Sequence, residues 1–347
     1  MIRPTMADVA EKAGVSTSTV SLVLNDKPGI SPEVRIAVMQ AVDDLGYRVR
    51  DRRLSPKQPA LETKRVAVVH FASPEPDYRF EASGLFVDFV ASIQDYLQDE
   101  NVNWALIPDY REEDQNNLGY RLLRNGNFLP DGLILIGILN QNSPLLQKAI
   151  ADQIPVVVAS RNWPELPVST VSQDHRQQAR LALEHLIGLG HKKIAFLARE
   201  VDRNYDWFQI RLDCYRETLA AIGEPVDDDL ITIGANGAEA AKALLARRPD
   251  VTAIFAIHDE NAVSAMQGLR EVGLEIPDHI SLIGLDDSAR PPEGYPALTT
   301  VSFSHNKAGQ LVARLILEQL ENDGVFYSKV FLRCHLIERE SCAAPRN

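Results

Sequence analysis

Residues 5–25 read TMADVAEKAGVSTSTVSLVLN, and this stretch supports the first prediction about the fold. Thr5 and Asp8 have the spacing of a capping box, in which a hydroxyl accepts an orphan amide and an acid favours the start of the helix. Gly14 supplies the positive φ that a tight turn needs, and Ser16 can cap a second helix that ends near Asn25. The stretch therefore predicts a helix over 6–13, a short turn and a second helix over 17–24.

A third helix is expected after Ser31, where Pro32 suits the first helical position, Glu33 adds an acid to the first turn and Gly46 marks the end. The apolar residues of the three helices predict one small core. Its members are Val9, Ala10, Ala13, Val15, Val20, Val23, Leu24, Val34, Val38, Val42 and Leu45.

The second helix carries an exposed face that is rich in hydroxyls and poor in helix-forming residues, comprising Thr17, Ser18, Thr19, Ser21 and Leu22. Hydroxyls and a capped helix N-terminus suit phosphate oxygens, and the first residues of a recognition helix meet base edges in a major groove. A small solvated bundle with a polar face is the alternative interpretation.

This part of the chain resembles the DNA-binding headpiece of the lactose and galactose repressor (LacI/GalR) family of bacterial transcription regulators. The matching segments are 5–10, 13–16, 19–21, 24–25, 31–35 and 45–47. The resemblance implies that Thr17, Ser18 and Leu22 contact base edges, Leu22 through an apolar contact such as a thymine methyl. It also implies phosphate contacts from Thr5, Ser16, Thr19, Ser21, Asn25 and Tyr47.

Residues 51–63 read DRRLSPKQPALET, and two prolines in a polar stretch predict a hinge between domains. The family usually has a hinge helix here, with a leucine that wedges into the minor groove, but Pro56 stands at that place and Pro59 follows. The hinge residues of this chain would be Arg50, Arg52, Arg53, Leu54 and Lys57, whose cations supply salt-sensitive phosphate contacts. A solvated tether is the alternative.

The charge is distributed unevenly along the chain. Thirty-six basic against 48 acidic side chains give a net charge of −12, which by itself argues against a nucleic-acid partner. Residues 1–65 hold 11 Lys or Arg against 8 acids, or +3, so the remainder carries −15. This split indicates a small basic-ended module attached to an acidic body.

From Lys64 onward, short apolar runs alternate with amphipathic stretches, and runs that are apolar throughout predict parallel strands buried on both faces. The expected strands are 66–71, 104–107, 132–138, 156–159, 194–197, 230–233, 253–257 and 280–285, and the expected helices are 85–97, 179–189, 207–222, 238–245 and 262–272. Late elements at 299–303, 307–320 and 329–337 would return across the crossing between two lobes.

The predicted fold is thus a small all-α helix-turn-helix headpiece (1–50), a hinge (51–63) and an α/β body (64–347) of two doubly wound parallel-sheet lobes. Lobe one would comprise about 64–161 plus 299–322, and lobe two about 162–298 plus 323–341. The body also resembles the family's effector-binding body, which is similar to periplasmic binding proteins, at 179–186, 189–196, 284–287, 298–301 and 339–341.

The cleft between such lobes is the expected place for a small ligand. The resemblance implies that Arg211 and Asp286 bind effector hydroxyls, a pairing of donor and acceptor that suits sugars. His258 and Asp259 are added as a pair, with His258 standing where the family commonly has Asn. Candidates for a stacking wall are Trp207, Phe208, Trp163 and Phe80, and lower-ranking candidates at the lobe crossing are Asp174, Arg161 and Gln177. For Arg211, Asp286 and His258 the alternative is a structural salt bridge.

Other chemistries find little support. No phosphate-binding loop, dinucleotide fingerprint, hydrolase elbow or zinc-protease motif occurs, so we expect no enzyme and no cofactor. Cys214, Cys334 and Cys342 lack metal-ligand spacing, and we expect no metal.

The start lacks the features of a signal peptide, and no apolar run reaches the roughly 18 residues of a membrane span. We therefore expect a cytoplasmic protein, nucleoid-associated when bound to DNA, rather than a transport binding protein.

These observations predict a transcription regulator, most simply a repressor of carbohydrate-utilisation genes. It would bind a palindromic double-stranded operator as a homodimer, with a mono- or oligosaccharide effector in the cleft. A sensor of a nucleotide, an amine or another non-sugar metabolite on the same scaffold, or a transcription activator, are the alternatives.

Overall fold

The computed structural model describes residues 5–24, 30–45, 63–71, 84–100, 102–109, 130–137, 139–224, 227–322, 324 and 326–346. They form two compact units, here called the headpiece and the body, and along the described chain the boundary falls between Thr63 and Lys64. None of the described helices combines the length and the apolar composition that crossing a membrane requires.

The headpiece contains the three predicted helices, α1 (Met6–Ala13), α2 (Thr17–Leu24) and α3 (Pro32–Leu45). The capping box of α1 is confirmed: the Thr5 backbone N–H donates to Asp8 Oδ2 (2.6 Å), and the Asp8 N–H donates to Thr5 Oγ1 (3.4 Å). Gly14 ends α1 at φ 66°, and Ser16 Oγ accepts the N–H of Thr19 (3.1 Å) at the start of α2. Local hydrogen bonds therefore determine the turn between α1 and α2.

A small apolar core holds the headpiece together. Its buried members are Val9, Ala10, Val20, Val23, Val38 and Ala41, and partly buried residues such as Met6, Val15 and Leu45 pack against them. All the core residues predicted from the sequence lie in this cluster.

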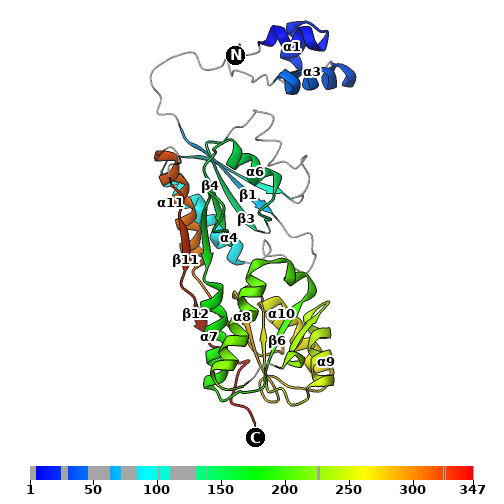
Figure 1. Cartoon of the computed structure of the whole chain (residues 1–347), viewed down its shortest axis with the longest axis vertical. Coiled ribbons are helices and arrows are strands. Elements are labelled where there is room, and N and C mark those ends of the chain that lie inside the picture. The colour runs from blue at the N-terminus through cyan, green and yellow to red at the C-terminus, as the bar shows by residue number, and fades with distance from the viewer. Residues whose placement is uncertain are drawn as a thin grey trace. The chain divides into compact units, whose positions relative to one another are not determined.

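The body contains two six-stranded sheets (Figure 1). The first consists of β1 (Arg65–Phe71), β2 (Asn103–Asp109), β3 (Gly132–Gly137), β4 (Val156–Ala159), β5 (Ser169–Gln173) and β11 (Lys329–Leu332), in the order β11-β5-β4-β3-β1-β2. All its pairings are parallel. The helices of this lobe that the structure describes are α4 (Gly84–Asp99), α6 (Pro144–Ala151) and α11 (His305–Glu321).

The second sheet consists of β6 (Ile194–Arg199), β7 (Ile231–Gly234), β8 (Ala253–Ala256), β9 (Ser281–Leu285), β10 (Thr299–Ser302) and β12 (His335–Ile337), in the order β12-β10-β9-β8-β6-β7. Only β12 is antiparallel to its neighbour. The helical elements of this lobe are α7 (His175–Gly188), η2 (Glu200–Asn204), α8 (Asp206–Ala221), η3 (Asp228–Leu230), α9 (Gly237–Arg247) and α10 (Asp259–Glu271). Two parallel-sheet lobes are therefore confirmed.

The predicted lobe boundaries need correction. Strand β5 lies within 162–298, the range predicted for lobe two, yet it pairs with β4 in the first sheet. Strand β10 was expected in lobe one with 299–322, but it pairs with β9 in the second sheet, and β11 pairs with β5 in the first. The described chain thus changes lobes after Gln173, after β10 and between β11 and β12, because strand pairing rather than sequence proximity decides membership.

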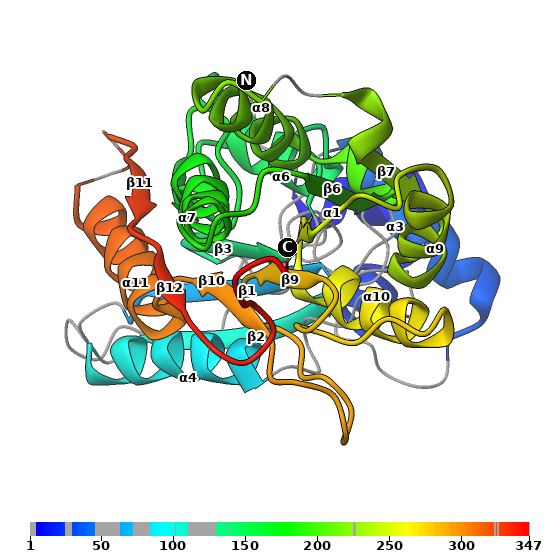
Figure 2. The same cartoon turned by 90° about the horizontal axis from the view of Figure 1, so that it is seen from below.

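Helix α11 returns to the first lobe and lies beside α4 (Figure 2). Gly309 permits this approach, since a Cβ added there would stand 2.5 Å from the carbonyl oxygen of Phe89. A side chain at this position would force the two helices apart.

Candidate functional site

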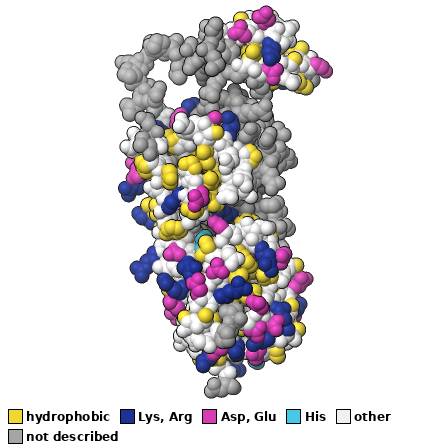
Figure 3. All heavy atoms as spheres, viewed as in Figure 1, with side chains coloured by type: hydrophobic (Ala, Val, Ile, Leu, Met, Phe, Trp, Pro, Cys, Tyr) yellow, Lys and Arg dark blue, Asp and Glu magenta, His cyan; other side chains and the backbone are white. Residues whose placement is uncertain are grey.

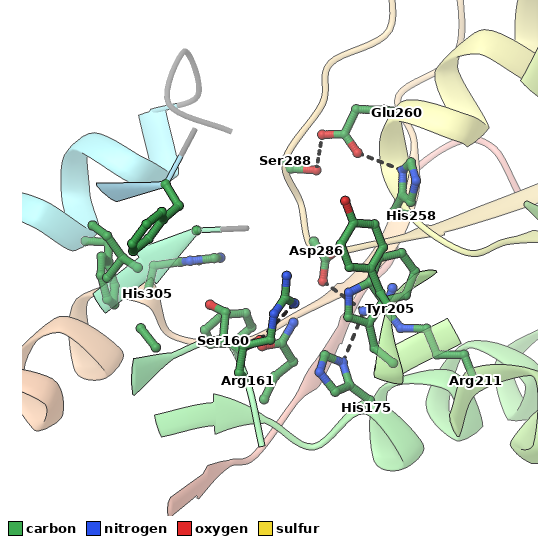
Figure 4. Close-up of a pocket in the computed structure, with 18 of the residues that line it drawn as sticks. Ser160, Arg161, His175, Tyr205, Arg211, His258, Glu260, Asp286, Ser288 and His305 are labelled. Atoms are coloured by element: carbon green, nitrogen blue, oxygen red, sulfur yellow. Dashed lines mark hydrogen bonds and ion pairs between the residues drawn. The ribbon is translucent and has the colours of Figure 1, made fainter. Parts of the chain in front are cut away.

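A pocket lies between the two lobes of the body, where the carboxyl ends of strands from both sheets face each other. Parallel α/β sheets place ligand sites at these ends. Four of the predicted effector residues line this pocket, namely Trp207, Arg211, His258 and Asp286, and Arg161 lines it from the first lobe. Figure 4 shows the charged and polar side chains of both lobes directed into it.

Arg211 is the buried centre of the second-lobe side. It projects from α8 and is 2% exposed. Its Nη1 donates to the carbonyl of Ile257 (2.6 Å), and its Nη2 donates to Gln178 Oε1 (2.8 Å). These bonds hold the guanidinium plane in one orientation before any ligand arrives.

Asp286 follows β9 and is fixed by the same amide. Gln178 Nε2 donates to Asp286 Oδ1 (2.8 Å), and Arg211 Nη2 lies 3.4 Å from the same oxygen. The side chain is 22% exposed, and Oδ2 accepts no hydrogen bond from a described residue. One carboxylate oxygen is thus committed to the protein, while the other remains available to ligand hydroxyls.

His258, at the N-terminus of α10, is buried among acids. Its Nε2 lies 3.3 Å from Asp202 Oδ1, and its Nδ1 lies 2.9 Å from Glu260 Oε2. Nδ1 also lies 3.4 Å from the backbone N–H of Asn261, but a protonated Nδ1 cannot accept that bond. The shorter contact to Glu260 favours the imidazolium, which donates from both nitrogens.

The charges around His258 shift two pKa values. Burial alone would lower the pKa of His258, but Asp202 and Glu260 together raise it to about 9. Burial would likewise raise the pKa of Asp202, yet His258 and Arg199 hold it well below its usual value. His258 is therefore a cation at neutral pH that joins η2 to α10.

This assignment predicts a pH dependence of stability. Because the folded pKa of His258 exceeds its unfolded value of 6.5, its contribution is complete below pH 6.5 and is lost as pH rises through about 9. The loss amounts to about 3 kcal/mol in the free energy of unfolding. Urea unfolding at pH 6 and pH 10 should therefore show a steeper decline for the wild type than for His258→Asn.

The variant His335→Asn, on the exposed side of β12, is the matched control and should follow the wild type. Parallel pH profiles for the wild type and His258→Asn would mean that His258 is neutral in the folded protein.

Several buried polar atoms of the pocket have no hydrogen-bond partner among the described residues. They are Gln173 Oε1, His175 Nε2 and Arg211 Nε. Burial and the positive charges of Arg211 and Arg161 hold the pKa of His175 well below its usual range. Its Nδ1 lies 3.4 Å from Arg211 Nη2 and accepts, so Nε2 carries the proton and is a donor. Unpaired buried donors and acceptors are costly unless a polar ligand satisfies them.

Aromatic rings form one wall of the pocket. Tyr205 and Trp207 stack with centroids 5.2 Å apart and planes 11° apart. The guanidinium carbon of Arg211 lies 4.9 Å from the centre of the Trp207 ring. Of the other predicted aromatic candidates, Phe208 and Trp163 lie outside the lining, and Phe80 lies outside the described residues.

Asp259 does not line the pocket, and the prediction that it contacts the effector is corrected. Its Oδ1 accepts from Thr300 Oγ1 (2.7 Å), and its Oδ2 accepts the backbone N–H of Ser288 (2.8 Å). Burial raises the pKa of Asp259 well above its usual value. Asp259 thus supports Ser288, which does line the pocket.

Of the three lower-ranking candidates at the lobe crossing, one lines the pocket and two support neighbouring structure. Asp174 caps α7 by accepting the N–H of Gln177 (2.9 Å), and Gln177 Oε1 accepts the N–H of Cys334 (2.7 Å). Neither lines the pocket, whereas Arg161 does.

Sequence reasoning missed several lining residues. They are His70, Gln173, His175, Tyr205, Glu260, Ser288 and His305. Most of them stand at or just after a strand end, which is the signal that could have found them. Among the described residues, no cluster of three or more His, Cys, Asp or Glu could hold a metal ion.

The residues predicted to contact DNA bases are exposed on the headpiece. Thr17, Ser18 and Leu22 are exposed on α2, while Val20 and Val23 of the same helix are buried. Thr5 and Ser16 are also exposed, and Thr19 and Ser21 are partly exposed. The predicted phosphate contacts Asn25 and Tyr47 and the hinge residues Arg50, Arg52, Arg53, Leu54 and Lys57 lie outside the described residues.

Comparison with known protein families matches the headpiece and the body separately. Residues 5–49 match the lacI family of bacterial regulatory proteins, and residues 183–342 match a periplasmic binding protein-like domain. The chain is 31% identical over 345 residues to the HTH-type transcriptional regulator CelR of Thermobifida fusca, covering 98% of both proteins. It is 30% identical over 351 residues to AscG of Escherichia coli (strain K12), covering 98% of this chain and 99% of that protein.

Solved structures share the fold over the whole length. A complex of CelR with cellobiose superposes with a TM-score of 0.68 at 29% identity, covering 98% of this chain and 100% of that one. A lac repressor dimer bound to operator and the anti-inducer ONPF superposes with a TM-score of 0.65 at 24% identity, covering 99% and 100%. The chain therefore belongs to the LacI family of bacterial regulatory proteins, which are transcription regulators and not enzymes.

Proposed function

We propose that this protein is a repressor of carbohydrate-utilisation genes that binds a palindromic operator as a homodimer and responds to a saccharide effector in the inter-lobe pocket. The observation that carries the effector proposal is the set of unsatisfied polar atoms on Gln173, His175 and Arg211 beside the open oxygen of Asp286. Sugar hydroxyls both donate and accept, so a saccharide can offer partners to groups of either kind. The cellobiose bound to CelR is consistent with such a ligand.

The stacked rings of Tyr205 and Trp207 support the same ligand class. The apolar face of a pyranose ring packs well on an aromatic surface, while its edge carries the hydroxyls. A wall of rings beside charged groups that are already oriented therefore fits a saccharide, because little reorganisation is needed on binding.

Direct readout is assigned to the exposed face of α2. Thr17 and Ser18 would contact base edges and Leu22 a thymine methyl, while Thr5, Ser16, Thr19 and Ser21 would contact phosphates. One headpiece offers too little surface for tight specific binding, so two headpieces on an inverted repeat are proposed.

The first lobe offers a surface for dimerisation. Val87 on α4 and Leu106 on β2 are large apolar side chains that are 61% and 40% exposed. Figure 3 shows hydrophobic side chains gathered over the first lobe, whereas acidic and basic side chains intermix over the second. Effector binding would shift the relative angle of the lobes and so the spacing of two headpieces, a coupling of about 1 to 3 kcal/mol.

The test is selection of random duplex DNA on the purified protein at two salt concentrations, repeated with mono- and disaccharides. We expect enrichment of an inverted repeat that one saccharide abolishes or strengthens. Abolition identifies an inducer of a repressor, and strengthening identifies a corepressor. Sequence-indifferent, salt-sensitive binding under every condition would contradict the proposal, and a response to nucleotides alone would favour a non-sugar sensor.

A further inference from the structure

The charged side chains at the pocket fall into pairs of opposite sign, with one exception. The pairs are Arg199 with Asp202 (3.1 Å), His258 with Glu260 (2.9 Å) and Arg211 with Asp286 (3.4 Å). Arg161 forms no ion pair with any described residue. Within the described part of the chain, one permanent positive charge of the pocket therefore has no counter-ion.

Arg161 is also poorly hydrogen-bonded for a buried group. It is 6% exposed, and its hydrogen bonds to described residues are two long ones, from Nε to the carbonyl of Leu139 (3.4 Å) and from Nη1 to the carbonyl of Ser160 (3.4 Å). The guanidinium carbon lies 5.2 Å from the centre of the Tyr205 ring. Burying a charge in this way is unfavourable unless a partner of opposite sign is supplied.

The backbone directs Arg161 into this position. Ser160, directly after β4, has φ 64°, a left-handed conformation that a residue other than glycine rarely adopts. Its N–H donates to the carbonyl of Val171 on β5 (2.8 Å), which holds the turn. Such strain is typical of functional sites.

No acid among the described residues lies within ion-pairing distance of Arg161. Both acidic lining residues among those described, Glu260 and Asp286, come from the second lobe and are already paired. His175 and Arg161 both line the pocket, and His175 Nε2 is a donor without a partner among the described residues (Figure 4). Arg161 and His175 thus bring a positive charge and hydrogen-bond donors to the pocket, which are properties of an oxyanion site.

We propose that the effector is an acidic saccharide whose oxyanion, a carboxylate or a phosphate, binds at Arg161 while Asp286 and Arg211 hold its hydroxyls. The inference rests on the proposed function, that this pocket binds a saccharide, and it specifies the chemical class. A planar guanidinium can donate two parallel bonds to either oxyanion, so the two sources share one recognition chemistry.

Calorimetric titration of the full-length protein tests the inference with matched neutral and acidic probes. The probes are glucose against glucuronate and glucose 6-phosphate, cellobiose against cellobionate, and inorganic phosphate alone. We expect at least one acidic saccharide to bind about tenfold or more tightly than its neutral counterpart, since each charge-assisted bond contributes strongly. Preference for the carboxylate or the phosphate members identifies the oxyanion.

Substitution of Arg161 should remove that preference. Arg161→Gln is expected to bring the acidic and neutral probes to equal affinity, and Arg161→Lys to retain part of the difference. Because the ligand-free protein no longer buries an unpaired charge, Arg161→Gln should also raise the thermal midpoint. Arg180→Gln, on the exposed face of α7, keeps the wild-type preference and midpoint as the matched control.

The outcomes separate the inference from the proposed function. Neutral saccharides that bind as tightly as the acidic ones, an acid preference that survives Arg161→Gln, or no binding of any acidic probe would each overturn the inference. In all three cases a neutral saccharide that alters operator binding would leave the proposed function standing. An acid preference lost in Arg161→Gln, without any effect on operator binding, would support the site and contradict the regulatory role.

Discussion

Replacing Asp286 with Ala is expected to weaken effector binding by roughly a hundredfold or more, because a carboxylate that accepts two hydroxyls makes two charge-assisted hydrogen bonds. The substitution also removes the acid that lies 3.4 Å from the buried Arg211, so the guanidinium loses its counter-charge. Operator affinity in the absence of effector should stay close to that of the wild type, since Asp286 lies in the body. Titration of the saccharide, followed by operator binding with and without it, measures both effects.

Two further variants make the result interpretable. Asp286 has φ 94°, and Asn tolerates positive φ better than Ala does, so Asp286→Asn keeps the backbone unstrained while removing the charge. We expect Asp286→Asn to weaken binding by about tenfold. Glu184→Ala, an exposed acid on α7, is the matched control and should leave binding unchanged. Wild-type affinity in both Asp286 variants would remove Asp286 from the effector site.

The headpiece could be predicted from its sequence because its decisive interactions are local. Thr5 and Asp8, which form the capping box, are three positions apart in the sequence. Gly14 ends the first helix, and Ser16, two positions later, caps the second. Each of these sequence patterns corresponds to a hydrogen bond between residues that are close in the sequence. Three-helix packing then follows from the apolar residues that the helices share.

The lobes of the body were harder to delimit because the decisive pairings are distant in sequence. Strand β5 reads Ser-Thr-Val-Ser-Gln, all five residues buried, so it lacks the apolar run that identifies a buried strand. Tertiary contacts hold part of this polar strand, such as the bond that Gln319 Nε2 donates to Ser169 Oγ (2.8 Å). Strand β11 then pairs with β5 across more than 150 residues, which no local pattern reveals.

Only part of the pocket was predicted, because its composition also depends on contacts between residues that are distant in sequence. Arg211, His258 and Asp286 carry chemistry that the sequence displays, at places where strands end or helices open toward the cleft. The roles of Arg161 and Asp259 depend on what surrounds them: Arg161 has no counter-ion among the described residues, and both carboxylate oxygens of Asp259 accept hydrogen bonds behind the pocket wall. Whether such a residue contacts the ligand or supports the pocket wall depends on its burial and its hydrogen-bond partners. Residue type alone does not give this information.

Replacing Val20 with Asp is expected to reduce operator affinity by about a thousandfold while leaving effector binding unchanged. Val20 is 0% exposed in a headpiece core whose buried members are six apolar residues. A carboxylate in such a core costs several kcal/mol, which is comparable to the whole stability of a small domain. The headpiece should therefore unfold, whereas the body is a separate compact unit with its own core. Fluorescence anisotropy with labelled operator and calorimetry with the effector measure the two activities in one preparation.

A control in the same unit separates unfolding from simple charge repulsion. Ile36→Asp adds the same negative charge at a site on α3 that is 64% exposed, so the headpiece stays folded and most of the operator affinity is retained. Val20→Ala, which removes only two methyl groups, should weaken operator binding less than Val20→Asp, because the cavity costs about 1 to 3 kcal/mol. Equal losses in Val20→Asp and Ile36→Asp would mean that charge, rather than the fold of the headpiece, controls DNA binding. Loss of effector binding in Val20→Asp would mean that the two units do not fold independently.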